Sequence, residues 1–244
     1  MAWSIDNTQS NAGTAGTTVT ITGFSVGSLT NGIGVVASFA QKTGGSQSSP
    51  SSITWNGSAM TKVTNQGNST GKLITDWWYI LGPTTGDIVA TWSVNQDLGM
   101  CIIARSYSGA QQSGQPDAGS GNTGNQNSNV GNQTTLTQSL TTVNDGALVL
   151  AALLETYTTN TSSFSNLATN EAVSNFSCNI ANDTKSPAGS DTVTWTASGN
   201  YQFSAEAMNI MSLIAAAGGA AHNTMAKATA TLSVLTTDKK LVLI

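Results

Sequence analysis

Apolar and polar residues alternate along much of the chain, in short segments separated by Gly, Asn, Asp and Pro. Ile53 and Trp55 alternate with polar residues and are followed directly by Asn56-Gly57. Asn-Gly between two alternating segments is the strongest short-range signal for a β-hairpin. The stretch from Ser52 to Ser108, which contains this hairpin, therefore indicates a β-strand protein.

Three segments are apolar on both faces of a two-residue period, and this pattern predicts strands in the interior of a sheet. They are residues 32–41, 98–107 and 147–155. The segment 201–217 is rich in Ala, Glu, Met and Leu, which are good helix formers. We predict a closing strand there, because the segment follows the turn 198–200 and its apolar residues are continuous.

The strand pattern predicts an all-β fold, a jelly-roll-type β-sandwich of ten or so strands in two antiparallel sheets. Its domain is expected to cover residues 1–217. Residues 218–244 form a C-terminal arm with two more strand-like runs, the second of which is LVLI. Because unpaired apolar β edges recruit partners, we expect the arm to pair with a neighbouring subunit or to dock on the domain.

The segment from Gly109 to Gln133 contains almost no apolar side chain. This composition predicts one long loop, and long loops inside compact domains are commonly functional. The loop is therefore a candidate working surface, together with the arm that follows Gly219.

Charged residues make up only 8% of the chain, and the formal net charge is −4. The seven lysines and the single arginine, Arg105, are scattered, so we expect no nucleic-acid partner. The longest apolar run, near 210–217, is too short to span a bilayer, and we expect no membrane insertion. The first sixteen residues show no signal-peptide pattern. Either a signal has been removed, or the protein is made in a host cytoplasm and reaches its site by another route, such as virion assembly and lysis.

The two cysteines, Cys101 and Cys178, both fall inside expected strands. Two interpretations stay open at this point. They are two small buried apolar side chains, or they form a disulfide.

Catalytic and metal-binding patterns are not found. The only histidine, His222, lies in the arm, so the domain has no histidine for a nucleophilic triad or a zinc site. The Gly-rich segments match neither of the phosphate-binding sequence patterns, GxxxxGK(S/T) and GxGxxG. We therefore predict no catalytic, cofactor-binding or metal-binding residues and no cofactor.

Acidic residues suggest two alternatives to this prediction, a glycosidase site and a calcium site. Two carboxylates could hydrolyse a glycosidic bond, with candidates Asp76, Glu155 and Glu206 in or beside strands. We expect Asp76 instead to face solvent or to pair with Arg105. Calcium is the other option, and the loop residues that suit it are Asp117, Asp145 and Asp183, although no spacing resembles a calcium loop.

The tryptophans between residues 52 and 108 are in phase with the aliphatic residues around them, so we expect core packing rather than a sugar-binding platform. Trp55-Asn56-Gly57, Gly82-Pro83 and the segments 106–109 and 116–118 resemble a β-sandwich domain of phage virion and bacterial surface proteins. That domain is similar in layout to jelly-roll and concanavalin-like modules. The resemblance covers roughly Ile53 to Ala118.

From this resemblance and the polar, charge-poor composition, we expect a non-enzymatic structural protein on the exterior of a phage particle. It would be a decoration, head-fibre or tail-associated protein at the virion surface, or alternatively an extracellular or cell-surface protein. Its partners would be copies of itself or other virion proteins. The alternative function is a carbohydrate-binding module or adhesin that holds surface glycans, and the third is a glycoside hydrolase.

Overall fold

The computed structural model describes residues 2–42, 48–65, 73–117, 125–128, 134–155, 160–173, 176–197 and 206–217. These residues form seventeen β-strands, paired antiparallel, and no helix. Within the described ranges, no helical segment has the length and apolar character needed to cross a bilayer. The predicted all-β class is confirmed.

The N-terminal half of the chain contains two sheets. One has five strands in the order β1-β9-β3-β7-β6, and we call it the N-terminal inner sheet. The other has four strands in the order β2-β8-β4-β5, and we call it the N-terminal outer sheet. The strands are β1 (Ser4–Gly13), β2 (Gly16–Phe24), β3 (Ile33–Gln41), β4 (Ser52–Trp55), β5 (Ser58–Ala59), β6 (Thr61–Asn65), β7 (Leu73–Leu81), β8 (Gly86–Gln96) and β9 (Gly99–Ser108).

The C-terminal half also contains two sheets. The C-terminal inner sheet has the order β10-β17-β12-β15-β14, and the C-terminal outer sheet has the order β11-β16-β13. The strands are β10 (Asn125–Ser128), β11 (Thr135–Thr141), β12 (Ala147–Glu155), β13 (Asn160–Ser162), β14 (Ala168–Val173), β15 (Phe176–Lys185), β16 (Ser190–Ala197) and β17 (Glu206–Leu213).

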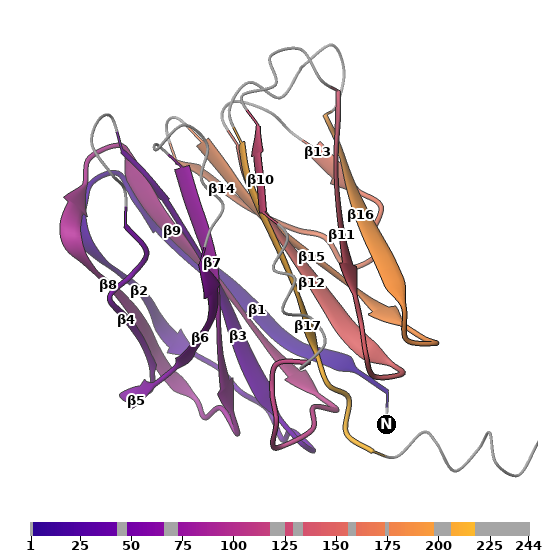
Figure 1. Cartoon of the computed structure of the whole chain (residues 1–244). Helices are drawn as coiled ribbons and strands as arrows, with labels where there is room; N and C mark the ends of the chain where they lie inside the picture. Colours follow the sequence, from indigo (N-terminus) through magenta and orange to yellow (C-terminus); the bar gives the residue numbers. More distant parts are fainter. Residues whose placement is uncertain are drawn as a thin grey trace, which may run out of the picture.

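The four sheets are stacked as layers, with the two inner sheets face to face (Figure 1). Three hydrophobic clusters separate the layers. One fills each half between its inner and outer sheet, and the third lies between the two inner sheets. We call this central layer the seam. It contains Val35 and Phe39 from β3 and Leu148 and Leu150 from β12, all 0% exposed.

The two halves have the same strand order. β1, β2, β3, β4, β6, β7, β8 and β9 correspond in chain order to β10 through β17, and each of their six pairings has a counterpart. Only β5 has none. The corresponding strands β8 and β16 also share local features: a buried tryptophan, Trp92 or Trp195, follows six positions after a glycine of positive φ, Gly86 or Gly189. The chain is therefore an internal duplication of one antiparallel motif.

The prediction of two sheets is wrong, because the described residues form four sheets. The outer strands alternate as predicted: β11 has exposed and buried positions in strict turn. By contrast, every residue of β3 and β12 is buried. Apolar residues on both faces predict a central position in a sheet, but here they also reflect a sheet that is covered by another sheet on each face.

The hairpin signal is confirmed. Trp55 and Ser58 are register partners, and Asn56 and Gly57 between them have φ values of 46° and 78°. Both angles lie in the left-handed region that a two-residue hairpin turn of this type requires. The expected core role of the tryptophans is also confirmed, since Trp55, Trp77 and Trp92 are at most 2% exposed.

The predicted closing strand is confirmed as β17, which pairs with β12 along its whole length. The predicted loop 109–133 needs a correction, because it contains β10, which pairs with β17 at the edge of the inner sheet. A four-residue polar strand carries no apolar alternation, so the pattern gave no sign of it. The predicted arm at 218–244 lies outside the described residues.

Candidate functional site

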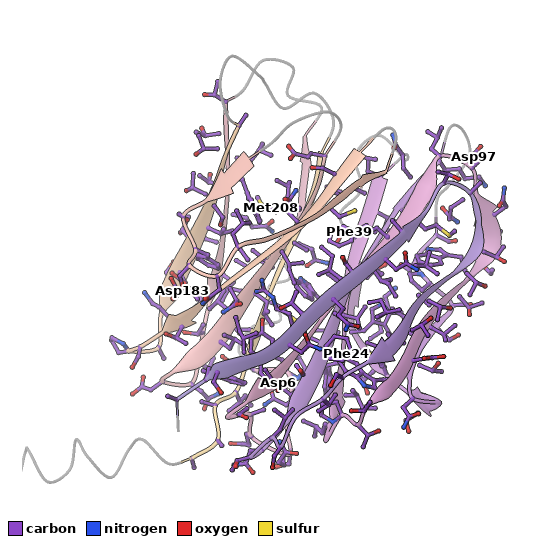
Figure 2. The ribbon with its side chains drawn as sticks, turned by 180° about the vertical axis from the view of Figure 1, so that it is seen from behind. Asp6, Phe24, Phe39, Asp97, Asp183 and Met208 are labelled. Atoms are coloured by element: carbon purple, nitrogen blue, oxygen red, sulfur yellow. The ribbon has the colours of Figure 1, made fainter. Side chains whose placement is uncertain are left out.

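A cavity of about 350 Å³ opens at one edge of the seam, where both halves contribute to its wall. The N-terminal half supplies an aromatic and apolar side, and the C-terminal half supplies mostly polar groups. The lining residues are Trp3, Ile5, Tyr107, Leu148, Ser165, Asn166, Asn182, Asp183 and Thr184. Figure 2, which shows the molecule from behind, labels Asp183 in the C-terminal half. We call this feature the seam cavity.

Arg105 of β9 lies behind the cavity wall and is only 3% exposed. Its Nε donates to the Thr8 hydroxyl at 3.1 Å, and its Nη1 donates to the Asn166 carbonyl at 2.9 Å and to Asn182 Oδ1. No carboxylate in the described part of the chain forms an ion pair with it. A buried guanidinium is thus held by neutral oxygens from both halves, which fixes the position of Asn182.

Tyr107 reaches the same amide. Its hydroxyl donates to Asn182 Oδ1 at 3.0 Å, and its ring packs edge-on against Trp3, with ring centroids 6.3 Å apart. Burial raises the pKa of the Tyr107 phenol above its ordinary value of 10.0, while the charge and hydrogen bonding of Arg105 oppose that rise. The phenol is therefore protonated at neutral pH and acts as a donor.

The indole of Trp3 is also fixed, because its Nε1 donates to the Gly146 carbonyl at 2.8 Å. This bond joins the start of β1 to the turn before β12. The ring lines the cavity and is only half-buried. An aromatic face held in place at an opening is a ready surface for packing against a ligand.

The polar side of the cavity is built from β15 and from the turn before β14. Asp183 Oδ1 accepts from the Thr184 amide at 2.8 Å, and Asp183 Oδ2 accepts from the Ser165 amide at 3.5 Å. Asn166 has a φ of 55°, and asparagine tolerates that left-handed conformation better than most residues. This conformation presents the Asn166 carbonyl to Arg105.

The duplication gives the cavity a counterpart that is occupied by protein. Matching β7 to β15 places Tyr79 at the position of Asn182. The Tyr79 hydroxyl donates to the Gln115 carbonyl at 2.8 Å, and the Gln115 side chain bonds the Ile214 backbone at both its amide and its carbonyl. The segment after β9 therefore covers this side of the seam.

Asp76 does not lie where it was expected. It faces neither solvent nor Arg105: it is 0% exposed and forms an ion pair with Lys62 at 3.2 Å. Asp76 and Arg105 lie on strands separated by β3, with Ser38 as the register partner of Asp76. Their side chains point to opposite faces of the inner sheet, Asp76 toward the outer sheet and Arg105 toward the seam. The sequence shows phase within a strand but not which strands are neighbours.

The other candidate acids are partly brought together. Glu155 and Glu206 are register partners on β12 and β17. Glu155 is 1% exposed and accepts from the Ser177 hydroxyl, so it is enclosed rather than placed in a cleft. The side chain of Glu206 lies outside the described residues.

The three acids considered for calcium do not form one cluster. Asp117 is buried and accepts from the Val143 amide and the Asn144 side chain, and Asp145 accepts from the Ala188 amide. Asp183 lies in β15 rather than in a loop, which is a correction. Over the ranges that the structure describes, no group of three or more His, Cys, Asp or Glu side chains is arranged to hold a metal ion.

Cys101 and Cys178 are both free thiols with 0% exposure. Of the two interpretations, the structure therefore agrees with two buried apolar side chains and not with a disulfide. They lie in the seam, one from each half, and a side-chain hydrogen bond connects them. Burial raises the pKa of Cys178 well above its ordinary value of 9.0, and the bond to Cys101 and the charge of Glu155 act in the same direction.

A second, shallower depression lies on the surface over β1 and β2, with a volume of about 400 Å³. Its lining is almost entirely polar, and the Asn11 side chain crosses it to donate to the Thr20 carbonyl at 2.6 Å. It lacks the aromatic wall and the buried polar groups of the seam cavity.

No protein family, curated protein or solved structure matches this chain. The structure is that of an all-β protein with two halves of the same strand order, stacked through their inner sheets. Of the cavity residues, the sequence had singled out only Asp183, and for another role. Trp3 precedes β1, whereas Tyr107 lies in β9 and Asn182 in β15, and no local spacing connects them.

Proposed function

We propose that the protein is a non-enzymatic structural protein on the exterior of a phage particle, as a decoration, head-fibre or tail-associated protein. The observation that carries this proposal is the strand order. In a jelly roll with strands lettered B to I, the sheets have the orders B-I-D-G and C-H-E-F. The orders β1-β9-β3-β7 and β2-β8-β4-β5 follow that pattern, with β6 as an addition.

The C-terminal half supports the same assignment, with the orders β10-β17-β12-β15 and β11-β16-β13. We therefore assign each half to the jelly-roll architecture, whose domains build viral capsids and lectins. Because one fold hosts many functions, the virion assignment needs a test of location.

Mass spectrometry of particles purified on a density gradient provides that test. Peptides of this chain should follow the major capsid protein through the gradient at a constant ratio. Absence of the chain from washed particles would remove the virion proposal and would favour the extracellular or cell-surface location.

The predicted partners are other copies of the chain or other virion proteins, with the arm at 218–244 as the connecting segment. A chain ending at Gly219 should then have a lower assembly mass than the full chain in multi-angle light scattering. Equal masses would remove the idea that the arm joins subunits.

A second candidate function is carbohydrate binding, alone or combined with the first. The seam cavity favours it, because an aromatic side chain, Trp3, beside polar lining residues such as Asn182 and Thr184 suits a polar ligand with an apolar face. The glycoside hydrolase alternative has less support, since Asp76 and Glu155 are enclosed.

A further inference from the structure

The outer strand β11 has a free edge that can pair with another strand. It pairs with β16 in continuous register from Thr135 to Thr141, and within the described residues no strand pairs with its other side. In Figure 1 it lies in the outermost layer of the C-terminal half. Its sequence, TLTQSLT, contains no charged residue and no proline, the residue types that commonly protect an edge.

The hydrogen bonds at the two ends of β11 show which residues point away from β16. At one end, the Ala197 amide donates to the Thr134 carbonyl. At the other end, the Thr142 amide donates to the Gly189 carbonyl. Bonded positions alternate in an antiparallel pair, so the even-numbered residues of β11 bond β16. The backbone amides and carbonyls of the odd-numbered residues, from Thr135 to Thr141, therefore face the free edge.

The other edge strands in the described part of the chain are protected or short. In β1, the side chains of Asn7 and Asn11 each accept from the next backbone amide at 2.8 Å. The Asn11 side chain also bonds the Thr20 carbonyl of β2. β6 and β14 have register shifts, and β5, β10 and β13 have four residues or fewer. Among the described edge strands, β11 is therefore the long one that lacks such protection.

A buried amide at the centre of β11 also lacks a partner. Gln138 is 5% exposed, and its Oε1 is enclosed and accepts no hydrogen bond. Trp195 Nε1, a donor on the adjacent strand β16, is likewise without a partner, so the two groups do not satisfy each other. A buried polar atom without a hydrogen bond is destabilising, which favours a donor supplied from outside the chain.

We propose that two copies of the chain pair through their β11 edges, antiparallel and about a two-fold axis that passes beside Gln138. In this register Thr135 pairs with Thr141 of the second copy, and Thr137 pairs with Ser139 of the second copy. The odd-numbered residues can then exchange up to about eight backbone hydrogen bonds. A two-fold interface uses the same surface on both copies, and such dimers are the commonest oligomers.

The side chain of Gln138 specifies this register. It would lie directly opposite Gln138 of the second copy at a non-hydrogen-bonded position, where Cα atoms are about 4.5 Å apart. Rotation about χ3, a broad torsion, directs each amide across the axis, and each Nε2 then donates to the other Oε1. A shift by two residues would retain the backbone bonding but would place Gln138 opposite Leu136 or Leu140, and both amides would then stay unsatisfied.

This inference deepens the proposed function and rests on it only for the kind of partner, another copy of the chain. The uncharged β11 strands bring no like charges together about the axis. A single strand edge is smaller than a standard protein interface, so we expect a dissociation constant of about 1–100 µM.

Cysteine cross-linking of the full chain tests the position of the axis. Q138C should form a covalent dimer with oxidised glutathione, in which the two thiols become a disulfide and two molecules of reduced glutathione are released. T141C is the matched control, because Thr141 is exposed on the same strand but would lie about 20 Å from its own counterpart. T141C should cross-link about tenfold less. The wild type gives the background, because Cys101 and Cys178 are buried.

T137P tests the backbone pairing. Proline removes an amide that faces the free edge and leaves the bonds between β11 and β16 in place. The dimer loses two hydrogen bonds by symmetry, so its dissociation constant should rise about tenfold or more in sedimentation equilibrium. The melting curve of T137P should stay close to that of the wild type.

Equal cross-linking of Q138C and T141C, a monomeric wild type at millimolar concentration, or an unchanged dissociation constant in folded T137P would overturn the proposal. Pairing of β11 with the arm of its own chain would also overturn it, and T137P would then lower the melting temperature without changing the mass. These outcomes are separate from the location test. A chain found in particles that forms no β11 dimer contradicts only this inference, and a β11 dimer absent from particles contradicts only the virion assignment.

Discussion

The thiol of Cys101 in β9 lies against the thiol of Cys178 in β15, and the two come from opposite halves of the duplication. Both are free and fully buried. They are therefore one of the side-chain pairs that join the two halves inside the seam, as the bonds of Arg105 and Tyr107 to Asn182 also do.

We expect the two thiols to react only when the halves separate. In the native protein neither should be alkylated by a maleimide, whereas in denaturant both should be, as counted by mass spectrometry. Refolding with oxidised glutathione should produce a Cys101–Cys178 disulfide, with two molecules of reduced glutathione released. Recovery of only free or glutathione-bound thiols after such refolding would contradict the expected proximity.

Replacing Gly34 should destabilise the N-terminal half. A Cβ at this position would lie 2.7 Å from a ring carbon of Trp55, and the ring is held by its Nε1 bond to the Thr84 carbonyl. G34A should lower the free energy of unfolding by about 1–3 kcal/mol. Urea denaturation followed by tryptophan fluorescence measures the change.

The matched control is G13A in β1, where a Cβ would have only ordinary contacts, the nearest at 3.7 Å from Met100. This substitution should change stability by less than about 1 kcal/mol. Equal effects of G13A and G34A would show that backbone entropy, and not the contact with Trp55, decides the outcome.

The protein should lose stability at alkaline pH. The pKa of Cys178 is raised from 9.0 and that of Tyr107 from 10.0, chiefly by burial. The unfolded chain then releases these protons at lower pH than the folded chain, so the unfolding free energy falls above about pH 9 and falls faster above about pH 10. The slope for each group is at most about 1.4 kcal/mol per pH unit.

Unfolding curves measured from pH 8 to pH 11 test this dependence, and Y107F isolates one component. Y107F should be less stable than wild type at pH 8, because Asn182 loses a donor, but it should decline less steeply above pH 10. Y79F serves as the control for loss of a tyrosine hydroxyl that is hydrogen-bonded but half-buried. If the unfolding free energy of Y107F fell as steeply above pH 10 as that of the wild type, Tyr107 would not be a source of the alkaline loss of stability.

The contributions of Lys62 and Asp76 to stability should depend on each other, because the two side chains form an ion pair. Asp76 is fully enclosed, and the Lys62 ammonium also lies 5.5 Å from the centre of the Trp78 ring. K62M removes the ion pair of a buried carboxylate and should lower the unfolding free energy by about 1–3 kcal/mol. D76N should lower the unfolding free energy by a similar amount, because the ion pair with Lys62 is lost.

The double variant K62M/D76N is the decisive measurement. Its loss should be smaller than the sum of the two single losses by about 0.5 kcal/mol or more, because the same interaction is removed only once. Strict additivity would show that Lys62 and Asp76 contribute independently.

Much of the local structure follows from the sequence. The Asn56-Gly57 turn requires two residues that accept positive φ, and this requirement is visible in the residue types alone. Alternation identified outer strands such as β11, and tryptophan phase identified the core. These features depend on neighbours along the chain, so a linear pattern contains them.

The repeat of one strand order in the two halves could not be predicted from the sequence. Trp92 and Trp195 are equivalent, but Tyr79 corresponds to Asn182 and Cys101 to Ala207. Antiparallel strand order needs only apolar residues of suitable size on the covered faces, and many sequences meet that condition. Similar topology therefore persists where the residue identities differ.

The sequence by itself determined that this chain is a charge-poor, all-β protein, where its Asn56-Gly57 turn lies and that its tryptophans between residues 52 and 108 are buried. Only the tertiary structure decided that the strands form four sheets, that the inner sheets meet in a seam, and that Asp76 pairs with Lys62. It also brought Trp3, Tyr107 and Asn182 to one cavity. The Tyr107–Asn182 bond joins residues 75 positions apart, and even the Lys62–Asp76 pair depends on which strands become neighbours, which no periodic pattern specifies.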